Sequence, residues 1–365
     1  MNAFVITATR SMRDYAAQTA KKLAGFPDIA SLGDTINGVD ILKASCFADG
    51  EMEIDVGFSI RGKDVVLFAS CARNEAGIGV TEAKIELYHA VDALKRSQAR
   101  KIIVFEPFVS CSRSDRTTRR SSVGLWVHFK ILASLGTNHI ITYQLHSDKS
   151  KSMVDPAACL FDDIPALNLL KQHLCDVYIQ DLRTLEGVVR PRWAFCSIDA
   201  GGEKLARGFA NAFGAPLVVA HKQRDYAHVN RIESINILSA EPIEGKVLWI
   251  VDDMVDTAGS AEALIRVLAG FKPAEINLIA VHPVFSPPAR QRLAALFDEK
   301  ILNRVMVTDT VYCPCAEPER IPGIEVVSSV GLSAKVIHAI ITNGSMRKLL
   351  RVFDPALYLS PPPGP

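Results

Sequence analysis

Side chains able to do chemistry gather directly after one strongly apolar stretch of the chain, Val247–Val251. Within the next nine residues come three carboxylates, two hydroxyls and a glycine. They belong to the segment made of Asp252, Asp253, Asp256, Thr257, Ala258, Gly259 and Ser260. Carboxylates accept hydrogen bonds from sugar hydroxyls, whereas hydroxyl side chains and free backbone N–H groups at the start of a helix bind phosphate. The segment therefore predicts a site for a ribose phosphate.

The elements on either side of this segment would place it at the edge of a sheet. The apolar stretch predicts a strand covered on both faces, at Lys246–Val251. Apolar residues then recur with helical spacing between Ala261 and Leu268, which predicts an amphipathic helix over Ser260–Gly270. A strand that ends in a solvated acidic turn is the alternative interpretation. A chance loop rarely combines three acids with Thr, Gly and Ser behind a fully apolar strand.

Two further turns carry groups suited to a diphosphate. The first is the Gly-rich turn made of Asp199, Ala200, Gly201 and Gly202. Its backbone N–H groups can hold a diphosphate, and Asp199 can bind a cation or a sugar hydroxyl, although ordinary turns between a helix and a strand have the same composition. The second is Lys222 and Arg224, after a strand predicted at Pro216–Ala220. Two cations there would stabilise a phosphoryl group in transfer, and a solvated basic loop is the alternative.

The first half of the chain contains three weaker candidates. Phe47, Asp49 and Glu51 form one, and Arg113, Ser114 and Asp115 form another. Each reads alone as a turn or a surface loop, but aromatic, guanidinium and carboxylate groups together could bind adenine and a triphosphate. The third is His146, which follows a strand predicted at His139–Tyr143. A lone histidine is more often structural than a ligand.

Composition limits the function classes. The 365 residues suffice for two α/β domains of ordinary size, and 48% hydrophobic with 22% charged residues is the composition of a globular protein. The net charge of +1 gives no electrostatic reason to expect a nucleic acid or a membrane surface as partner. We therefore expect a small-molecule partner.

The chain shows neither a membrane span nor a disulfide framework. No apolar run approaches the roughly 20 residues needed to cross a bilayer, and the amino terminus reads as a first strand, so we expect a cytoplasmic protein. The 8 cysteines are scattered, without a CxxC pair. Cys313 and Cys315 could form a redox or metal element, but free thiols in a reducing compartment are the expected state.

Strand and helix patterns alternate along the chain, which predicts an α/β fold of mainly parallel sheets flanked by helices. The predicted strands are Phe4–Ala8, Asp64–Ser70, Lys101–Phe105, His139–Tyr143, Ala194–Ile198, Pro216–Ala220, Lys246–Val251, Glu275–Val281 and Val305–Thr308. The clearest predicted helices are Glu82–Ser97, Val123–Leu135, Gly202–Ala212 and Ser260–Gly270. Turn residues at 162–165 predict domains over residues 1–165 and 166–350, followed by a partly disordered tail at 351–365. A last helical stretch, Leu332–Thr342, could pack back on the first domain.

The segment from Asp252 to Ser260 resembles the phosphoribosyl-diphosphate motif that type I phosphoribosyltransferases share with ribose-phosphate diphosphokinases. All six elements, in this order, resemble the ribose-phosphate diphosphokinase family from about Phe47 to Ile341. The resemblance implies two tandem phosphoribosyltransferase-like domains. It also implies transfer of the β,γ-diphosphoryl group of MgATP to the C1 hydroxyl of ribose 5-phosphate, giving 5-phosphoribosyl 1-diphosphate and AMP.

The resemblance also implies roles for the candidate residues. Phe47, Asp49 and Glu51 match the loop that a neighbouring subunit offers to adenine, which implies a homo-oligomer, a dimer or a multiple of dimers. Those matching the ATP-binding positions are Arg113, Ser114, Asp115 and His146. His146 and Asp199 match magnesium-linked positions, and Lys222 and Arg224 match a catalytic pair on a mobile loop. The ribose 5-phosphate site is matched by Asp252, Asp253, Asp256, Thr257, Ala258, Gly259 and Ser260.

Some positions depart from the family pattern. The family usually has Asp where this chain has Gln144, Gln where it has Ser114, and a Gln-Ile-Gln-Gly-Phe-Phe-like run where it has Asp148–Met153. These departures bear on metal and adenine binding and on regulation by phosphate or ADP. Two other functions stay open: a non-catalytic regulatory homologue, and a type I phosphoribosyltransferase that consumes the diphosphate. The retained Lys222, Arg224 and acidic pair argue against the first, and the second domain argues against the other.

Overall fold

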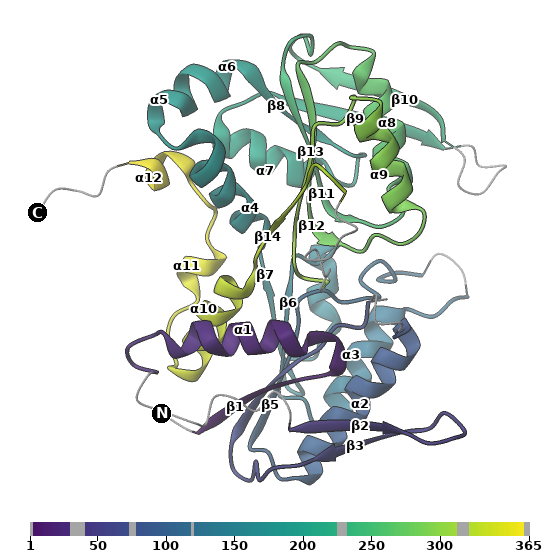
Figure 1. Ribbon diagram of the computed structural model, residues 1–365, viewed down its shortest axis with the longest axis vertical. Helices are drawn as coiled ribbons and strands as arrows, with labels where there is room; N and C mark the ends of the chain where they lie inside the picture. Colours follow the sequence, from purple (N-terminus) through teal and green to yellow (C-terminus); the bar gives the residue numbers. More distant parts are fainter. Residues whose placement is uncertain are drawn as a thin grey trace, which may run out of the picture. The chain divides into compact units, whose positions relative to one another are not determined.

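The computed structural model describes residues 3–29, 41–72, 78–117, 120–224, 232–311 and 321–360 (Figure 1). These residues form two compact units. The first contains the chain up to Pro165, residues 310–311 and Ser328–Arg351. The second contains Ala166–Asp309, residues 321–327 and residues 352–360. Residues 328–350, which we expected in the second domain, therefore belong to the first unit.

The first unit is built on a parallel sheet of five strands. In spatial order these are β1 (Phe4–Ala8), β4 (Asp64–Phe68), β5 (Lys101–Glu106), β6 (His139–Tyr143) and β7 (Leu160–Ile164). Each neighbouring pair is parallel. A separate antiparallel hairpin joins β2 (Leu42–Cys46) to β3 (Met52–Val56). The central strands are almost wholly buried, as parallel strands covered on both faces must be.

Helices cover both faces of this sheet (Figure 1). They are the 3-10 turns η1 (Arg10–Met12) and η3 (Asp148–Met153) and the α-helices α1 (Arg13–Ala24), α2 (Val80–Arg96), α3 (Gly124–Ser134), α10 (Val330–Ile341) and α11 (Arg347–Leu350). The Tyr15 hydroxyl of α1 hydrogen-bonds Ser329 and Ser333 beside and within α10, each at 2.7 Å. The Tyr143 hydroxyl of β6 reaches Ser333 at 2.6 Å. These buried contacts tie α10 to the first unit.

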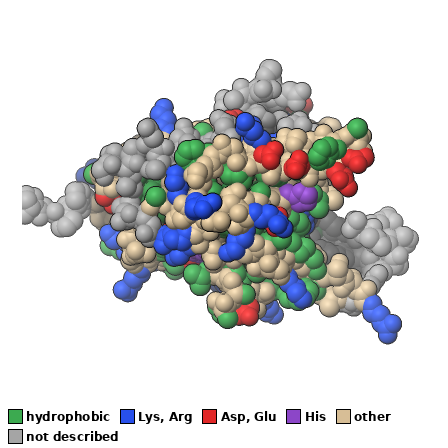
Figure 2. Space-filling view, turned by 90° about the horizontal axis from the view of Figure 1, so that it is seen from below, with side chains coloured by type: hydrophobic (Ala, Val, Ile, Leu, Met, Phe, Trp, Pro, Cys, Tyr) green, Lys and Arg blue, Asp and Glu red, His purple; other side chains and the backbone are tan. Residues whose placement is uncertain are grey.

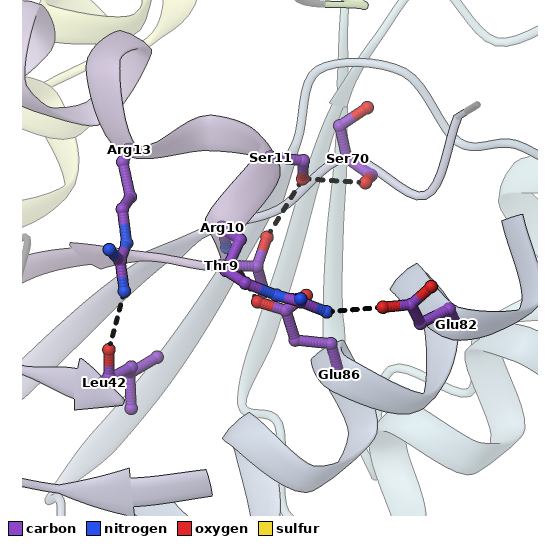
Figure 3. Close-up of polar contacts among 8 residues, drawn as sticks. All are labelled: Thr9, Arg10, Ser11, Arg13, Leu42, Ser70, Glu82 and Glu86. Atoms are coloured by element: carbon purple, nitrogen blue, oxygen red, sulfur yellow. Dashed lines mark hydrogen bonds and ion pairs between the residues drawn. The ribbon is translucent and has the colours of Figure 1, made fainter. Parts of the chain in front are cut away.

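The start of α1 is anchored to α2 by charge (Figure 3). The backbone N–H and the Nε of Arg10 donate to the buried carboxylate of Glu86 at 2.7 and 3.0 Å, and Nη2 donates to Glu82 at 2.8 Å. The neighbouring Ser11 hydroxyl donates to the carbonyl oxygen of Ser70 at 2.9 Å, just beyond β4. The carboxyl ends of β1 and β4 are thereby held together with α2.

The second unit is built on a sheet of seven strands. In spatial order these are β10 (Ile232–Ser239), β9 (Leu217–Arg224), β8 (Trp193–Ser197), β11 (Val247–Val255), β12 (Glu275–Pro283), β13 (Arg304–Thr308) and β14 (Ile324–Val327). Every neighbouring pair is parallel except β9 with the edge strand β10. The chain builds outward from β8 on one side and from β11 on the other, so the strand order reverses between these two strands.

The helices of the second unit pack on both faces of this sheet. They are α4 (Leu167–His173), a π-helical turn (Leu174–Ile179), α5 (Leu182–Thr184), a second π-helical turn (Leu185–Val189), α6 (Arg190–Arg192), α7 (Glu203–Phe213), α8 (Gly259–Ala269), α9 (Ala289–Asp298) and α12 (Pro355–Leu359). Leu264 of α8 and Leu293 of α9 join one core cluster with alternate residues of β8 and β11. On β8 the intervening residue Phe195 stacks on Phe213 of α7, with ring centroids 5.5 Å apart.

Most of the predicted strands and helices are present, with ends shifted by a few residues. The α/β class with mainly parallel sheets is confirmed. Within the predicted tail, α12 forms and the Tyr358 hydroxyl donates to Asp176 at 2.7 Å; residues 361–365 lie outside the described part, so their predicted disorder stays a prediction. The sequence patterns did not define strands β2, β3, β7, β10 and β14 or helices α1 and α9, whose apolar patterns are short or mixed with polar residues.

The near-zero net charge conceals a locally basic region of the first unit. Figure 2 shows Lys and Arg side chains gathered over the middle of one face, with Asp and Glu side chains toward one margin. Basic residues around the amino ends of β4 and β5 are Arg61, Lys63, Lys95, Arg96, Arg100 and Lys101. Arg96 pairs with Asp92, and Arg100 pairs with Asp64. Part of this positive charge is therefore neutralised locally.

None of the described helices is long and apolar enough to cross a membrane. The six described cysteines are free thiols. All but Cys46 are buried or half-buried, and burial raises the pKa of Cys196 to about 12. Cys313 and Cys315 lie outside the described residues.

One buried cation in the second unit lacks an acidic partner among the residues that the structure describes. Lys171 of α4 is only 6% exposed, and its Nζ lies 4.9 Å from the ring centroid of Phe209 on α7. Burial lowers the pKa of Lys171 from 10.5 to about 8. The aromatic ring stabilises the cation, but water would stabilise it more. The positive charge of Lys171 therefore opposes folding.

Replacing Lys171 by Met is expected to stabilise the protein at neutral pH. Because the pKa falls from 10.5 to about 8 on folding, the unfolded chain binds more protons between these values, and stability rises with pH across this window. Below pH 8 the buried charge opposes folding in full, so Lys171→Met should raise the free energy of unfolding by up to about 3 kcal/mol. Urea unfolding at pH 7 and pH 10.5 measures this difference. The exposed-lysine variant Lys300→Met is the control, and an equal effect of both variants would contradict the account.

Candidate functional site

The two predicted turns of the second unit lie side by side at the point where the strand order reverses. β8 and β11 are adjacent and parallel, with Ser197 opposite Val251. The chain then leads from β8 into α7 and β9 on one side, and from β11 into α8 and β12 on the other. Ligands of open α/β sheets bind outside the carboxyl ends of the strands at such a point. The topology therefore places the turn at residues 199–202 and the segment at 252–260 beside each other at one edge of the sheet, where a ligand crevice is expected.

The turn after β11 presents an anion-binding helix start. α8 begins at Gly259, and its preceding residue Ala258 has the left-handed backbone conformation, with φ 59°. Within the described part of the chain, no side chain caps this helix end. The side chains of Thr257 and Ser260 are exposed. The uncapped N–H groups, the helix dipole and two available hydroxyls together suit a phosphate dianion.

The acidic pair lies inside β11 rather than after it. We expected the strand to end at Val251, but β11 continues to Val255 and includes Asp252 and Asp253. The backbone N–H of Asp253 donates to Oδ1 of Asp252 at 2.9 Å, and Asp253 is buried. Pairing with β12 extends the strand, since Asp252 and Met254 both stay in register with it. The sheet thus fixes the positions of both carboxylates.

Like charges are crowded at this strand end. The pKa of Asp252 is raised well above its ordinary value, first by burial and then by the charge of Asp253. The carboxylate of Asp199 also raises it, which shows that the turn after β8 faces the acidic pair. Asp252 lies within electrostatic reach of both other carboxylates, and carboxylate oxygens are the hard donors that Mg²⁺ prefers. The residues present therefore fit a magnesium ion, which would relieve their repulsion.

The turn after β8 differs from its expected form in one respect. Oδ1 of Asp199 accepts a hydrogen bond from the backbone N–H of Gly202 at 3.0 Å. A Cβ on Gly201 would lie 3.2 Å from the same oxygen, so glycine leaves room for the carboxylate. We expected the N–H groups of this turn to be available to a diphosphate, but Asp199 occupies one of them. The side chain of Asp199 thus closes the turn that leads into α7.

The basic pair occupies a strand rather than a loop. Lys222 and Arg224 lie at the end of β9, and their backbone pairs with β10 opposite Ile235 and Ile232. The expected mobile loop therefore does not begin at Lys222. Residues 225–231, which would continue it, lie outside the described part of the chain. The catalytic role of both residues stays a prediction.

The candidates at Phe47, Asp49 and Glu51 lie at the tip of the β2–β3 hairpin. The N–H of Phe47 donates to the carbonyl oxygen of Glu51 at 2.8 Å, and the Glu51 N–H donates to Oδ1 of Asp49 at 3.1 Å. Gly50 completes the tight turn with φ 93°. The Phe47 ring is 54% exposed. An aromatic ring held out on a rigid hairpin is available to another surface.

The candidates at Arg113, Ser114 and Asp115 lie in a turn between β5 and α3. Oγ of Ser114 accepts the N–H of Gly124, the first residue of α3, at 2.9 Å. The Asp115 carboxylate accepts the Ser150 hydroxyl at 3.4 Å, so this turn contacts η3. The Ser114 hydroxyl thus has a structural partner, and ATP binding by it stays a prediction.

His146 follows β6, as expected, and its side chain is exposed. The preceding Gln144 has φ 43°, and its N–H donates to Ile164 of β7 at 3.0 Å, which turns the chain sharply away from the sheet. His146 belongs to the first unit and Asp199 to the second, so their joint link to magnesium stays a prediction. Among the described side chains, no group of three His, Cys, Asp or Glu is arranged as a preformed metal site.

Two charged residues near the strand ends were not predicted as site residues from the sequence. Arg292 of α9 donates through Nη1 to the carbonyl oxygen of Thr257 at 2.9 Å. Arg10 binds Glu86 at the end of β1 (Figure 3). Neither stands in a motif, and only packing between distant elements brings each to its position. No local pattern in the sequence could have identified them.

Replacing Asp252 by Asn is expected to stabilise the ligand-free protein at neutral pH. Because folding raises the pKa of Asp252, its contribution to stability is present at low pH and is lost as pH rises above the ordinary value of 3.8. Asn stays neutral, so its stabilising advantage should grow as pH rises from 4 to 8. Thermal unfolding between pH 4 and pH 8 measures it, with the exposed-site variant Asp298→Asn as control. A pH-independent difference would contradict this explanation.

Comparisons with known proteins agree with this architecture. A family model described as the N-terminal domain of ribose phosphate pyrophosphokinase matches residues 4–136. A second, described as a phosphoribosyl transferase domain, matches residues 187–301 and so includes both turns of the crevice. The expected fold of two phosphoribosyltransferase-like domains is confirmed.

Individual relatives match over most of their length. A ribose-phosphate pyrophosphokinase of Burkholderia pseudomallei is 33% identical over 330 residues, which are 88% of this chain and 94% of that protein. One from Nostoc sp. is 32% identical over 308 residues, 84% of each chain. The crystal structure of phosphoribosylpyrophosphate synthetase from Mycobacterium smegmatis matches with a TM-score of 0.76 at 26% identity, covering 93% of this chain and 99% of that chain. The chain therefore belongs to the ribose-phosphate pyrophosphokinase family, which is the ribose-phosphate diphosphokinase family that its motifs resemble.

Proposed function

We propose that this protein is a ribose-phosphate diphosphokinase, which transfers the β,γ-diphosphoryl group of ATP to the C1 hydroxyl of ribose 5-phosphate. The products are 5-phosphoribosyl 1-diphosphate and AMP. The observation that carries the proposal is the crevice between β8 and β11, where an uncapped helix start lies beside three crowded carboxylates. Relatives named for this activity, which match over more than four fifths of this chain, support it.

The segment from Asp252 to Ser260 would hold the sugar phosphate. The 5-phosphate accepts hydrogen bonds from the N–H groups at the start of α8 and from the exposed hydroxyls of Thr257 and Ser260. The carboxylates of Asp252 and Asp253 accept hydrogen bonds from the vicinal ribose hydroxyls. These contacts orient the C1 hydroxyl for attack, which is the main protein contribution to such reactions.

Magnesium is the expected cofactor. When bound, it would screen the charge of the triphosphate and hold the transferred phosphoryl oxygens. On this chain Asp199 and the pair Asp252 and Asp253 supply the donors in the second unit. His146 is proposed as a further magnesium-linked and ATP-binding position in the first unit.

In the reaction the C1 oxygen bonds to the β-phosphorus of ATP, and the bond from that phosphorus to the oxygen bridging to the α-phosphate breaks. AMP leaves with the electron pair, and the hydroxyl proton passes to solvent or a nearby base. Charge spreads over the transferred group, so cations should stabilise it. Lys222 and Arg224 are proposed for this role.

Adenine recognition is assigned to the first unit and to a second subunit. Arg113, Ser114 and Asp115 would hold ATP. Phe47, Asp49 and Glu51, at the exposed hairpin tip, would reach the adenine of a neighbouring protomer. This arrangement requires a homo-oligomer, either a dimer or a multiple of dimers. We place the enzyme in the cytoplasm, with ATP and ribose 5-phosphate as its partners and neither nucleic acid nor membrane.

Incubating the purified protein with ribose 5-phosphate and MgATP is expected to produce AMP and 5-phosphoribosyl 1-diphosphate in equal amounts. Phosphorus NMR and nucleotide chromatography measure both products. Removal of magnesium with EDTA should abolish the reaction, and added magnesium should restore it. ADP as the nucleotide product would indicate ordinary kinase chemistry and refute the proposal. No turnover, combined with activation of a second protein, would favour the non-catalytic homologue.

Replacing Lys222 or Arg224 by Ala is expected to lower kcat by about 100- to 10,000-fold, because each stabilises charge that develops only in the transition state. The dissociation constant of ribose 5-phosphate, measured by calorimetry, should change little. Gln223→Ala, between them on the same strand, is the matched control. Loss of ribose 5-phosphate affinity in step with kcat would assign the pair to substrate binding instead.

A further inference from the structure

The guanidinium of Arg292, from the helix next to α8, reaches the turn at residues 257–260, which we call the phosphate turn. Arg292 lies on α9, and its Nη1 donates to the carbonyl oxygen of Thr257 at 2.9 Å. Its Nε pairs with Glu262 of α8 at 3.1 Å. Glu262 thereby aims the guanidinium at the turn, and the two helices α8 and α9 are joined in front of it. The guanidinium remains about one third exposed, with 35% of the side chain accessible.

The hydrogen bond to Thr257 fixes the orientation of one peptide plane. In a trans peptide the C=O and the following N–H point in opposite directions. Because Arg292 holds the carbonyl oxygen of Thr257, the N–H of Ala258 must point the other way, away from α9. Rotating this plane by half a turn would remove that N–H from its position and destroy the hydrogen bond.

Backbone conformation shows that the observed orientation needs such support. Ala258 has φ 59° and ψ 5°, which is the sparsely populated left-handed region for a residue with a Cβ. Rotation of the peptide plane before Ala258 would move φ by roughly 180° to a negative value, the side of φ space that residues with a Cβ usually adopt. The local preference therefore opposes the orientation that the structure shows. The contact from Arg292 favours it.

Gly259 is required by the same contact. A Cβ at this position would lie 2.8 Å from Nη1 of Arg292 and 3.5 Å from its central carbon. No atom of the turn itself would be so close, since the Thr257 hydroxyl is 3.8 Å away. The absence of a side chain at Gly259 thus leaves the path along which the guanidinium reaches Thr257. Any larger residue must displace it.

From these contacts we infer that Arg292 is a positioning residue for the 5-phosphate of the sugar substrate. It holds the Thr257–Ala258 peptide in the orientation that presents N–H groups to the anion, and its positive charge adds to that of the helix start. The inference rests on the proposed function for the identity of the anion. It adds a residue from α9 to a site that the motif confines to residues 252–260.

Calorimetry with ribose 5-phosphate alone tests the inference without any turnover. Arg292→Met keeps the length of the side chain and removes the donor and the charge. Its dissociation constant should rise about 10- to 100-fold, which is the usual effect of losing one charged hydrogen bond. In steady-state assays KM for ribose 5-phosphate should rise with it, while kcat at saturation stays within about threefold. Unchanged affinity would overturn the inference.

A matched control variant distinguishes the hydrogen bond from Arg292 to Thr257 from the ion pairs around Glu262. Arg266 of α8 also pairs with Glu262, at 3.3 Å, and with Glu299, but the structure gives it no contact with the turn among the described residues. Arg266→Met should therefore leave ribose 5-phosphate affinity unchanged. Equal losses in the Arg266 and Arg292 variants would show a general electrostatic effect and overturn the positioning role. Millimolar guanidinium should restore binding to Arg292→Ala but not to a merely destabilised protein.

A double-mutant cycle guards against a variant that simply folds poorly. Gly259→Ala should weaken ribose 5-phosphate binding by displacing the guanidinium, so it should weaken Arg292→Met no further. Losses that multiply in the double variant would mean that Gly259 acts independently, which would contradict the inference. The melting temperatures of all three variants, taken without ligand, identify any that are unfolded.

The outcome is distinguishable from failure of the proposed function. A wild-type protein that binds ribose 5-phosphate through Arg292 but makes no AMP would refute the diphosphokinase proposal and keep the inference. If the wild type makes AMP and its KM for ribose 5-phosphate equals that of Arg292→Met, the diphosphokinase proposal stands and the positioning role of Arg292 is refuted. Absence of ribose 5-phosphate binding by the wild type would overturn both.

Discussion

Crowding of negative charge at the carboxyl ends of β8 and β11 is the constraint on which the site depends. Burial and the neighbouring charges of Asp253 and Asp199 raise the pKa of Asp252, so the ligand-free fold works against ionisation of its own side chain. A protein selected only for stability would have neutral residues there. A perturbed carboxyl group at a switch point of the strand order indicates a candidate functional site, because a bound cation or sugar hydroxyl would supply the compensation that the polypeptide lacks. The repulsion thus prepares the crevice for its ligands.

The phosphate turn is a second place at this strand end where the local structure is unfavourable by itself. Ala258 keeps an unfavourable backbone conformation, and α8 starts without a side-chain cap among the described residues. A capping Ser or Asp would satisfy the helix end and fill the anion site. Tertiary contacts maintain the open arrangement instead, through the pairing of β11 with β12 and through Arg292 on α9. Local strain persists only where the surrounding structure supports it.

The sequence predicted those parts of the structure whose signals are local. The apolar run before Asp252 and the periodic residues up to Leu268 predicted β11 and α8 because burial imposes their spacing directly. The extension of β11 through Asp252 and Asp253 could not be predicted, since acidic residues are unusual in a buried strand and only pairing with β12 keeps them there. The sequence left open whether residues 332–342 pack back on the first domain, because the hydroxyl contacts of Tyr15 and Tyr143 that hold this segment there have no periodic signature. Arg292 was missed for the same reason.

The departures from the family pattern are structurally related. Ser114, where the family usually has Gln, binds the N–H of Gly124 at the start of α3. The segment Asp148–Met153, which stands where the family usually has a Gln-Ile-Gln-Gly-Phe-Phe-like run, forms η3, and its Ser150 donates to Asp115 of the same turn as Ser114. Two separate sequence differences therefore involve neighbouring residues of one turn in the first unit, on the side assigned to the nucleotide. The sugar-phosphate motif of the second unit shows no such departure. A change confined to the nucleotide side would leave the transferred group and its acceptor as they are and alter how ATP or a regulatory nucleotide is held.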